Sequence, residues 1–447
     1  MANTCIIEIN DAGLTAADAN GLRLTSPGYA VFDGKVLHVG DAAFTQARLN
    51  PRRTYDRFWS QLDQQPLNRA AGDANSHADL AYFHLRDFWE NLKQDTDEVI
   101  FAVPGDFGKP QLALLLGIAQ TLEIPVNGLV ATAVAAAASV AGDAPRLYLD
   151  AELHRMTATQ VSGGSALALG THREVSKQGI ASLYDAWATM IAERFVQDTR
   201  YDPLHQAAAE QKLYERLPEW LTGLQGREHA RFELQVGQRS HHVEISITEL
   251  QQAAASIYQS IIDVTGTAHG AIVLLSHTLA DLPGLQAALN NRLLAPPVAL
   301  QQTTVAESVL GHLDVVRSDA SAPAFVTRLP GAISGAPQAP AASTAKQTKQ
   351  TPSHLLFEWK AYPINGAPLV LEAGPPRGLR LGETPKGAVI TLRAGAAVLE
   401  PGAKAGTLKL NGDIVDEESP LSVGDAIVLD GAQEMRLISL VSGDGTA

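Results

Sequence analysis

The feature that most constrains this chain is an abrupt change of composition late in the sequence. Residues 329–353 read LPGAISGAPQAPAASTAKQTKQTPS, with almost no side chain that could form a core. Such a stretch cannot offset the entropy lost on ordering it, so it predicts a flexible linker. A coil of this length would span roughly 25–30 Å on average. The chain is therefore predicted to fold as two parts, residues 1–328 and 354–447.

The part before the linker alternates short apolar runs with long amphipathic stretches. Apolar residues at i, i+3 and i+4 spacing predict helices packed on a sheet. Strands are predicted at 5–9, 29–32, 36–39, 99–103, 146–149 and 271–275, and helices at 78–93, 109–122, 182–197, 206–221, 247–264 and 282–292. This order of elements indicates an α/β body, with two lobes.

The part after the linker has an all-β pattern. Short runs such as LVLEA, AVITL, TLKLNG and AIVLD are separated by glycine, proline or acidic turns. Short strands at such even spacing predict a small β-sandwich or barrel.

Composition narrows the classes of function. The net charge is −14 and no basic patch stands out, which argues against a nucleic-acid or acidic-membrane partner. Cys5 is the single cysteine, so no disulfide framework or cysteine-rich metal site is expected. The sequence begins without a basic segment followed by an apolar run, and its longest apolar stretch is too short to span a bilayer. A cytoplasmic protein is the expectation.

Three segments of the front part carry a family resemblance. They are KVLHVGDAAFTQARLNPRRTYDRFW at 35–59, VIFAVPGDFGKPQLALLLGIAQTLEI at 99–124, and the alanine-rich run ATAVAAAASVAG that follows. Together they resemble the ATPase domain of the 70-kDa heat-shock chaperones over about residues 5–317. The resemblance implies a two-lobed, actin-like ATPase fold. The family's peptide-binding domain and lid have no counterpart, because the chain runs directly into the linker.

The positions that contact the nucleotide in that family are altered here. The lysine that reaches the γ-phosphate falls on Trp59, and the glutamate that helps to organise metal and water falls on Val130 or Ala131. The first phosphate loop corresponds to Asn10, Asp11, Ala12, Gly13 and Leu14, and the second to 150–157, where Asp150 remains but Glu152, Leu153 and His154 replace glycines. Backbone N–H groups need glycine to approach phosphates closely, so ATP binding there is not expected.

The adenosine side of the site is altered in the same way. Ser276 and His277 occupy the third glycine signature, and His277 is expected to block the pocket. The helix residues that grip adenine and ribose fall on Pro218, Leu221 and Thr222. Pro218 further predicts that this helix ends or kinks. No cofactor and no metal is expected, and Mg·ATP or Mg·ADP is the alternative.

The back part resembles a forkhead-associated domain. Asn411-Gly412 and the run LSVGDAI at 421–427 match its later half, and Arg380 with Gly382 loosely matches its start. The serine–histidine motif of the family is missing, and Arg393 begins the segment near where it would be. Acidic residues 413 and 416–418 make the neighbouring loop unsuitable for a phosphate. Arg380, Arg393 and Asn411 are the candidate peptide-binding residues.

Several residues have a plain structural interpretation as well. Asp150 is expected at a strand end, bonded to nearby backbone. Glu152 and His154, without a third ligand, are expected in an exposed turn. His241 and His242 lie in an alternating segment and should point to opposite faces of a strand. Trp59 and Trp220 are expected to fill the core of a closed crevice.

These patterns predict a catalytically inactive, chaperone-like pseudo-ATPase. Its expected function is to bind other proteins as an adaptor or scaffold, and a heat-shock-ATPase-like paralogue is one candidate partner. One alternative is a divergent ATP-binding chaperone or actin-like ATPase, which Asp11, Gly13 and Asp150 favour. A second alternative is a reader of phosphothreonine peptides.

Overall fold

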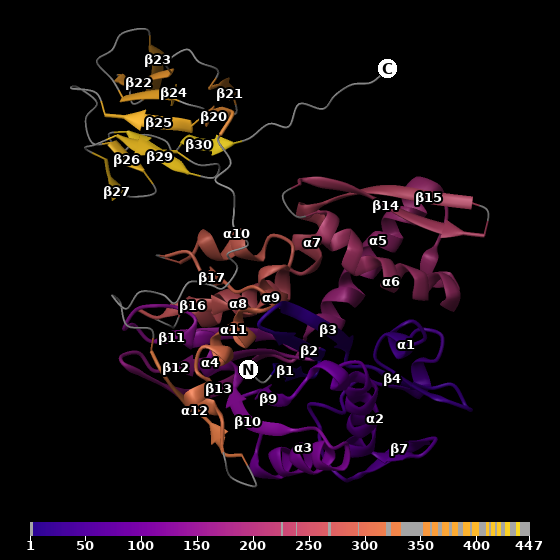
Figure 1. The fold of residues 1–447 in the computed structure, drawn as a ribbon. Coiled ribbons are helices and arrows are strands. Elements are labelled where there is room, and N and C mark those ends of the chain that lie inside the picture. Colours follow the sequence, from indigo (N-terminus) through magenta and orange to yellow (C-terminus); the bar gives the residue numbers. More distant parts are fainter. Residues whose placement is uncertain are drawn as a thin grey trace. The chain divides into compact units, whose positions relative to one another are not determined.

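The computed structural model describes most of the front of the chain and most strands of the back (Figure 1). The described residues are 3–224, 227–237, 239–266, 270–293, 295–318, 323–331 and, with several short gaps, 352–438. The chain divides into two compact units, Met1–Pro337 (the front unit) and Gln338–Ala447 (the back unit). Most of the predicted linker lies outside the described residues.

The first sheet of the front unit has the strand order β18-β10-β9-β1-β2-β3. The chain first forms an antiparallel meander, and the later strands then add in parallel on the free side of β1. The strands are β1 (Thr4–Asn10), β2 (Gly13–Asp18), β3 (Gly21–Pro27), β9 (Glu98–Val103), β10 (Val126–Ala131) and β18 (Phe325–Val326). Strand β9 is buried at every position, as a central parallel strand should be.

The second sheet has the order β17-β16-β11-β12-β13-β19 and the same design. Its strands are β11 (Arg146–Ala151), β12 (Met156–Val161), β13 (Ala166–Ser176), β16 (Ile272–Leu275), β17 (Val298–Ala299) and β19 (Arg328–Pro330). In β19, Leu329 pairs with Leu167 and is buried. The front unit thus continues past residue 328, where the sequence predicts the linker to begin.

The two sheets repeat one topology. In each, a three-stranded meander is followed by two strands that run parallel to its first strand, so the order 3-2-1-4-5 occurs twice. Helices follow the fourth strand in each repeat, α3 (Lys109–Thr121) in the first and α9 (His277–Ala280) with α10 (Leu285–Asn290) in the second. After the fifth strand come α4 (Thr132–Ala138) and, in the second repeat, α11 (Thr304–Leu310) and α12 (Leu313–Val316).

The alanine-rich segment forms α4, which packs between the two sheets. All seven of its residues are buried, and it contacts α11 as well as strands of both sheets. Because alanine lacks atoms beyond Cβ, the helix can approach both sheets closely. This agrees with the tightly packed helix that the sequence predicts here.

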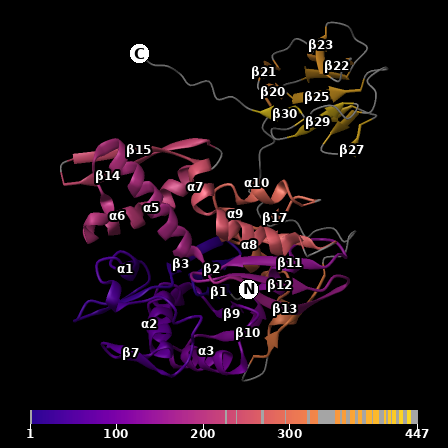
Figure 2. The ribbon, with the colours of Figure 1, turned by 180° about the vertical axis from the view of Figure 1, so that it is seen from behind.

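Each repeat carries an insertion after its meander, and α1, β4 and β7 of the first lie on the same side of the front unit as α5, α6, β14 and β15 of the second (Figures 1 and 2). The first contains β4 (Ala30–Phe32), β5 (Leu37–Val39), α1 (Gly40–Phe44), η1 (Pro51–Arg53), β6 (Thr54–Tyr55), β7 (Pro66–Ala71), β8 (Ala74–Ser76), α2 (His77–Glu90) and η2 (Lys93–Asp95). The second contains α5 (Ile180–Thr199), η3 (Pro203–His205), α6 (Ala207–Gly223), β14 (His229–Val236), β15 (Arg239–Ser246), α7 (Ile247–Ala253) and α8 (Ala255–Gly266).

Two helix predictions need correction. Helix α6 runs through Pro218 to Gly223 and does not end at the proline. Proline removes one backbone donor, and burial of Leu217, Trp220 and Leu221 around it offsets that loss. The helix predicted at 247–264 is two helices, interrupted at the buried Ala254.

The back unit forms two antiparallel sheets, as the strand pattern predicts. They have the orders β21-β20-β30-β29-β26-β27 and β23-β22-β24-β25-β28, and residues of both form one buried cluster. The strands are β20 (His354–Phe357), β21 (Lys360–Pro363), β22 (Leu369–Gly374), β23 (Gly378–Gly382), β24 (Ala388–Arg393), β25 (Ala396–Glu400), β26 (Leu408–Leu410), β27 (Asp413–Ile414), β28 (Ser419–Pro420), β29 (Ala426–Leu429) and β30 (Met435–Ile438). Among the described residues of the whole chain, no helix is long and apolar enough to cross a membrane.

Candidate functional site

A crevice of about 350 Å³ lies between the two repeats of the front unit, and a neighbouring cavity of about 530 Å³ shares Ile180, Tyr184 and His277 with it. The repeated topology brings the first turn of each meander to it, β1–β2 from one side and β11–β12 from the other. Asn10, Gly13, Asp150 and Leu153 line it from these turns, and the insertions add Tyr29 and other side chains. The sequence-predicted nucleotide positions of both loops thus meet at one place.

The insertions also contact each other. The backbone N–H of Arg48 donates to Gln211 Oε1 at 2.8 Å, and Gln211 Nε2 donates to the carbonyl of Phe44 at 2.8 Å. The Arg48 guanidinium reaches Asp185 at 2.7 Å and lies 3.6 Å from the centre of the Tyr214 ring. These contacts connect the two repeats beside the crevice.

A hydrogen bond joins the ends of the two first strands. Asn10 Nδ2 donates to Asp150 Oδ2 at 3.1 Å, and the backbone N–H of Ala151 donates to Asp150 Oδ1 at 2.8 Å. Ser276 also donates to this carboxylate. Burial nevertheless raises the pKa of Asp150 to about 6. The predicted backbone bond of Asp150 is confirmed, and the carboxylate additionally bridges the two repeats.

Asp11 belongs to the first turn but reaches the second. Its Oδ1 accepts the backbone N–H of Leu153 at 2.5 Å, and the residue is 3% exposed. Its other oxygen, Oδ2, is buried without a hydrogen bond from the described residues. Burial raises the pKa of this carboxyl, because an ionised group without full compensation is costly there.

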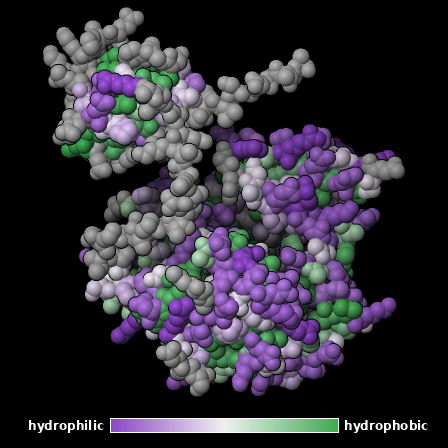
Figure 3. All heavy atoms as spheres, viewed as in Figure 1, coloured by the Kyte–Doolittle hydropathy of each residue, from purple (hydrophilic) through white to green (hydrophobic). Residues whose placement is uncertain are grey.

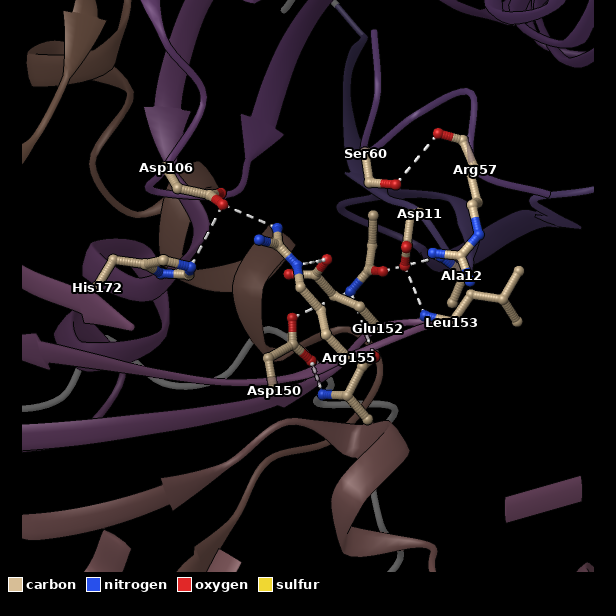
Figure 4. Close-up of polar contacts among 12 residues, drawn as sticks. Asp11, Ala12, Arg57, Ser60, Asp106, Asp150, Glu152, Leu153, Arg155 and His172 are labelled. Atoms are coloured by element: carbon tan, nitrogen blue, oxygen red, sulfur yellow. Dashed lines mark hydrogen bonds and ion pairs between the residues drawn. The ribbon is translucent and has the colours of Figure 1, made fainter. Parts of the chain in front are cut away.

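Glu152 and Leu153 are buried in the second turn and His154 is half-buried, so the exposed turn predicted for Glu152 and His154 is wrong. Glu152 is 2% exposed and accepts from Arg155 Nε at 2.6 Å (Figure 4). Arg155 also pairs with Asp106 at 2.8 Å. The ion pair lets a carboxylate occupy an interior position that the sequence pattern alone assigns to solvent. Burial and the nearby Asp11 still raise the pKa of Glu152 to about 8.

His154 and His172 each lie beside an aspartate. His154 Nε2 is 3.2 Å from Asp56 Oδ1, and His172 Nε2 is 3.5 Å from Asp106 Oδ2. Burial lowers the pKa of His172, which favours its neutral form. Neither histidine belongs to a group of three or more metal-ligating side chains, since the described residues contain no such group.

Glu8 is an acidic residue of the crevice that the sequence analysis missed. It lies on β1 among Cys5, Ile6, Ile7 and Ile9, and it faces the crevice beside Asp150. Burial, followed by the charge of Asp150, raises the pKa of Glu8 to about 8. A lone glutamate within an otherwise apolar strand is the signal that could have identified it.

The two tryptophans are core residues, as predicted, but they do not close the crevice. Trp59 is fully buried and donates to His84 Nδ1 at 3.0 Å, and Trp220 stacks on Phe232 with ring centres 4.7 Å apart. Neither residue lines the open space of about 350 Å³. His277 does line it, so this histidine narrows the crevice without filling it. Burial lowers the pKa of His277.

Gly13 serves strand packing at this site. A Cβ atom there would lie 2.2 Å from the carbonyl oxygen of Ser26 on the neighbouring strand. Gly28 is equally restricted, since its Cβ would lie 2.1 Å from the carbonyl oxygen of Asp11. The resemblance implies that Gly13 lets the backbone approach a phosphate. In the structure, Gly13 and Gly28 instead let neighbouring backbone segments of the chain approach each other.

Of the residues predicted on the adenosine side, Pro218 lines the crevice, whereas Leu221 and Thr222 line the neighbouring cavity. His241 and His242 are on β15, as expected, and His241 stacks on Tyr201 with ring centres 4.5 Å apart. In the back unit, the side chain of Arg380 and the whole of Asn411 lie outside the described residues. Arg393 is exposed and pairs with Glu400 at 2.7 Å and Glu418 at 3.3 Å.

Comparison with known proteins leaves the chain without an assigned family. No protein-family model matches the sequence, and no curated protein matches it.

Proposed function

We propose that the front unit is a catalytically inactive relative of the 70-kDa heat-shock ATPases and acts as a protein-binding scaffold or adaptor. The duplicated order 3-2-1-4-5, with an insertion in each repeat and a crevice between the repeats, supports an actin-like ATPase fold. The sequence segments that resemble the family support the same assignment.

The observation that carries the inactive assignment is the acidic turn at 152–155. Glu152, Leu153 and His154 stand where the family places glycines, Glu152 forms an ion pair with Arg155, and Asp11 and Asp150 lie nearby. A nucleotide phosphate placed there would meet carboxylates and side-chain atoms in place of backbone N–H groups. The loss of these donors removes the main source of phosphate affinity.

The two-unit organisation of the chain supports a role in protein binding. The chain keeps a folded two-repeat body, a proline- and alanine-rich connection and a separate β-unit, which is an arrangement suited to holding partners. The visible face of the front unit is largely hydrophilic, with scattered apolar side chains (Figure 3). A heat-shock-ATPase-like paralogue is the partner that the resemblance favours.

Two measurements test this proposal. Calorimetric titration of the full chain with Mg·ATP and Mg·ADP should give no binding up to millimolar ligand. Sedimentation velocity with a purified 70-kDa heat-shock ATPase domain should give a complex that survives removal of residues 338–447. Micromolar ATP affinity would overturn the inactive assignment, and an unchanged sedimentation profile would overturn the proposed partner.

One observation favours the ATP-binding alternative, namely that the crevice is open and is lined by Gly13 and Asp150, with Asp11 buried next to it. The same titration decides it. For the phosphothreonine-reader alternative, Arg393 is the described candidate, and it is already paired with two glutamates. Titration of a phosphothreonine peptide into the wild type and into Arg380→Ala tests that alternative.

A further inference from the structure

The ionisable groups that line the crevice are acidic, apart from His277 and tyrosine. Three carboxylates line it, those of Glu8, Asp41 and Asp150, and its lining contains neither lysine nor arginine. The lowered pKa of His277 keeps that side chain neutral near pH 7. A cavity with this lining favours a cation over an anion.

Aromatic and aliphatic side chains form the rest of the wall. Tyr29 and Phe44 pack edge to face with ring centres 5.4 Å apart, and Tyr184 lines the crevice from α5 in the other repeat. Leu153 and Ile180 complete an apolar surface. Aromatic faces attract a cation that carries an apolar body, whereas a bare metal ion would need a shell of ligands. No group of three metal-ligating side chains occurs among the described residues.

The inner end of the crevice has polar groups that lack partners. The Glu8 carboxylate makes no hydrogen bond or ion pair with other described residues. It also lines a water-sized chamber of about 10 Å³, together with Asp150 and Thr132. Thr132 is 4% exposed, and its Oγ1 has no hydrogen-bond partner among the described residues. Glu8 therefore offers free acceptor atoms to the crevice, and Thr132 offers a free hydroxyl to the small chamber behind it.

The nearest arginines are already engaged elsewhere. Arg155 pairs with Glu152 and Asp106, and Arg48 pairs with Asp185 and covers Tyr214. Asp150 accepts hydrogen bonds from Asn10, Ser276, Tyr148 and the backbone of Ala151, but it remains beside Glu8. A further positive charge between Glu8 and Asp150 would relieve the repulsion between these two carboxylates.

We propose that the crevice binds a small primary amine with an apolar body. The ammonium group lies between Glu8 and Asp150 and donates hydrogen bonds to their carboxylates. The apolar body lies against Tyr29, Phe44 and Tyr184. This site goes beyond the proposed scaffold function, because it assigns a ligand class to a crevice that no longer suits a nucleotide.

Calorimetry on the full chain at pH 7.5 tests the charge requirement. The probe is phenethylamine, and 2-phenylethanol and phenylacetate have the same aromatic body with a neutral and a negative group. The amine should bind at least about tenfold more tightly than the alcohol, and phenylacetate should not bind. Equal affinities for the amine and the alcohol would overturn the proposal. Binding of magnesium chloride alone with an affinity equal to that of the amine would overturn it too.

Glu8→Gln tests the position of the ammonium group. The substitution keeps the side-chain shape and removes a carboxylate that is costly to ionise, so the variant should remain folded. It should bind phenethylamine at least about tenfold more weakly, whereas Glu90→Gln, an exposed control, should leave the affinity unchanged. Unaltered affinity in Glu8→Gln would overturn the site. If the folded wild type did not bind the amine, the amine site would be rejected and the scaffold proposal would be unaffected. Tight binding of Mg·ATP would instead reject the scaffold proposal.

Discussion

The two repeats of the front unit share a strand order but differ at their first turns. The β1–β2 turn is short, with Asp11 and Ala12 between the strands, whereas the β11–β12 turn holds the four residues from Glu152 to Arg155. The short turn relies on backbone packing, and the long turn relies on a buried ion pair. Each turn therefore holds a buried carboxyl group, Asp11 in the first and Glu152 in the second, but the two groups are stabilised by different contacts.

A glycine supports each turn, and these positions should show the largest effects. A Cβ at Gly28 would lie 2.1 Å from the carbonyl oxygen of Asp11, and one at Gly179 would lie 2.3 Å from that of Glu152. We expect Gly28→Ala and Gly179→Ala each to lower the free energy of unfolding by about 3 kcal/mol or more. Urea denaturation followed by circular dichroism measures this.

Gly117→Ala is the matched control for these two variants. Gly117 is exposed within α3, and no atom lies within 4 Å of a Cβ built there. Alanine should stabilise the helix by about 0.5–1 kcal/mol. Similar free energies of unfolding for all three variants would show that the close backbone contacts at Gly28 and Gly179 do not stabilise the turns.

Removing the cation of the second turn should have the next largest effect. Arg155→Met leaves Glu152 buried without its partner, and we expect a loss of about 3 kcal/mol at pH 8. The double variant Arg155→Met/Glu152→Gln should recover most of it, because no buried charge is left. Arg216→Met, which removes an exposed pair with Glu219, should cost less than about 0.5 kcal/mol. No recovery in the double variant would contradict the ion-pair explanation.

The acidic groups of both turns should make stability fall with increasing pH. Burial raises the folded-state pKa of Asp150 to about 6 and those of Glu8 and Glu152 to about 8. A raised carboxyl pKa contributes stability below the unfolded-state value near 4, and this stability is lost as pH rises through the folded-state value. We expect a loss of several kcal/mol between pH 5 and pH 8, because each of these groups contributes up to about 1.4 kcal/mol per pH unit.

Urea midpoints measured across this range for the wild type and Glu8→Gln provide the check. The variant lacks one of the titrating groups, so its midpoint should fall less steeply with pH. A midpoint that rises between pH 5 and pH 8 would show that these carboxyls ionise freely in the folded protein.

The hydrogen bond between the repeats should show the smallest effect. Asn10→Ala removes the bond to Asp150 and should lower the free energy of unfolding by about 1 kcal/mol. Asn10→Asp should cost more at pH 8 than at pH 5, because it places another carboxylate beside Asp150. Asn91→Ala, at the exposed end of α2, is the control and should change stability by less than about 0.5 kcal/mol. Identical losses at both pH values for Asn10→Asp would argue against charge repulsion.

Much of the front unit could be predicted from local pattern. Apolar periodicity located β1, β9, β11 and β16 and the main helices within a few residues, because each is a long or strongly apolar segment. The helix does not end at Pro218, because tertiary packing outweighed a local helix breaker. The exposed turn predicted at Glu152 was wrong because its partners, Arg155 and Asp106, come together only in the folded protein.

By itself, the sequence determined the order of the elements, the composition change that separates the two units, and the loss of glycines from the second turn. The strand order within each sheet, its repetition and the meeting of the two first turns were decided by the tertiary structure. Glu8 and Asp150 are far apart in the chain, and only the packing of the two sheets brings them to one crevice. Pairing between distant strands depends on long-range contacts that local periodicity does not encode.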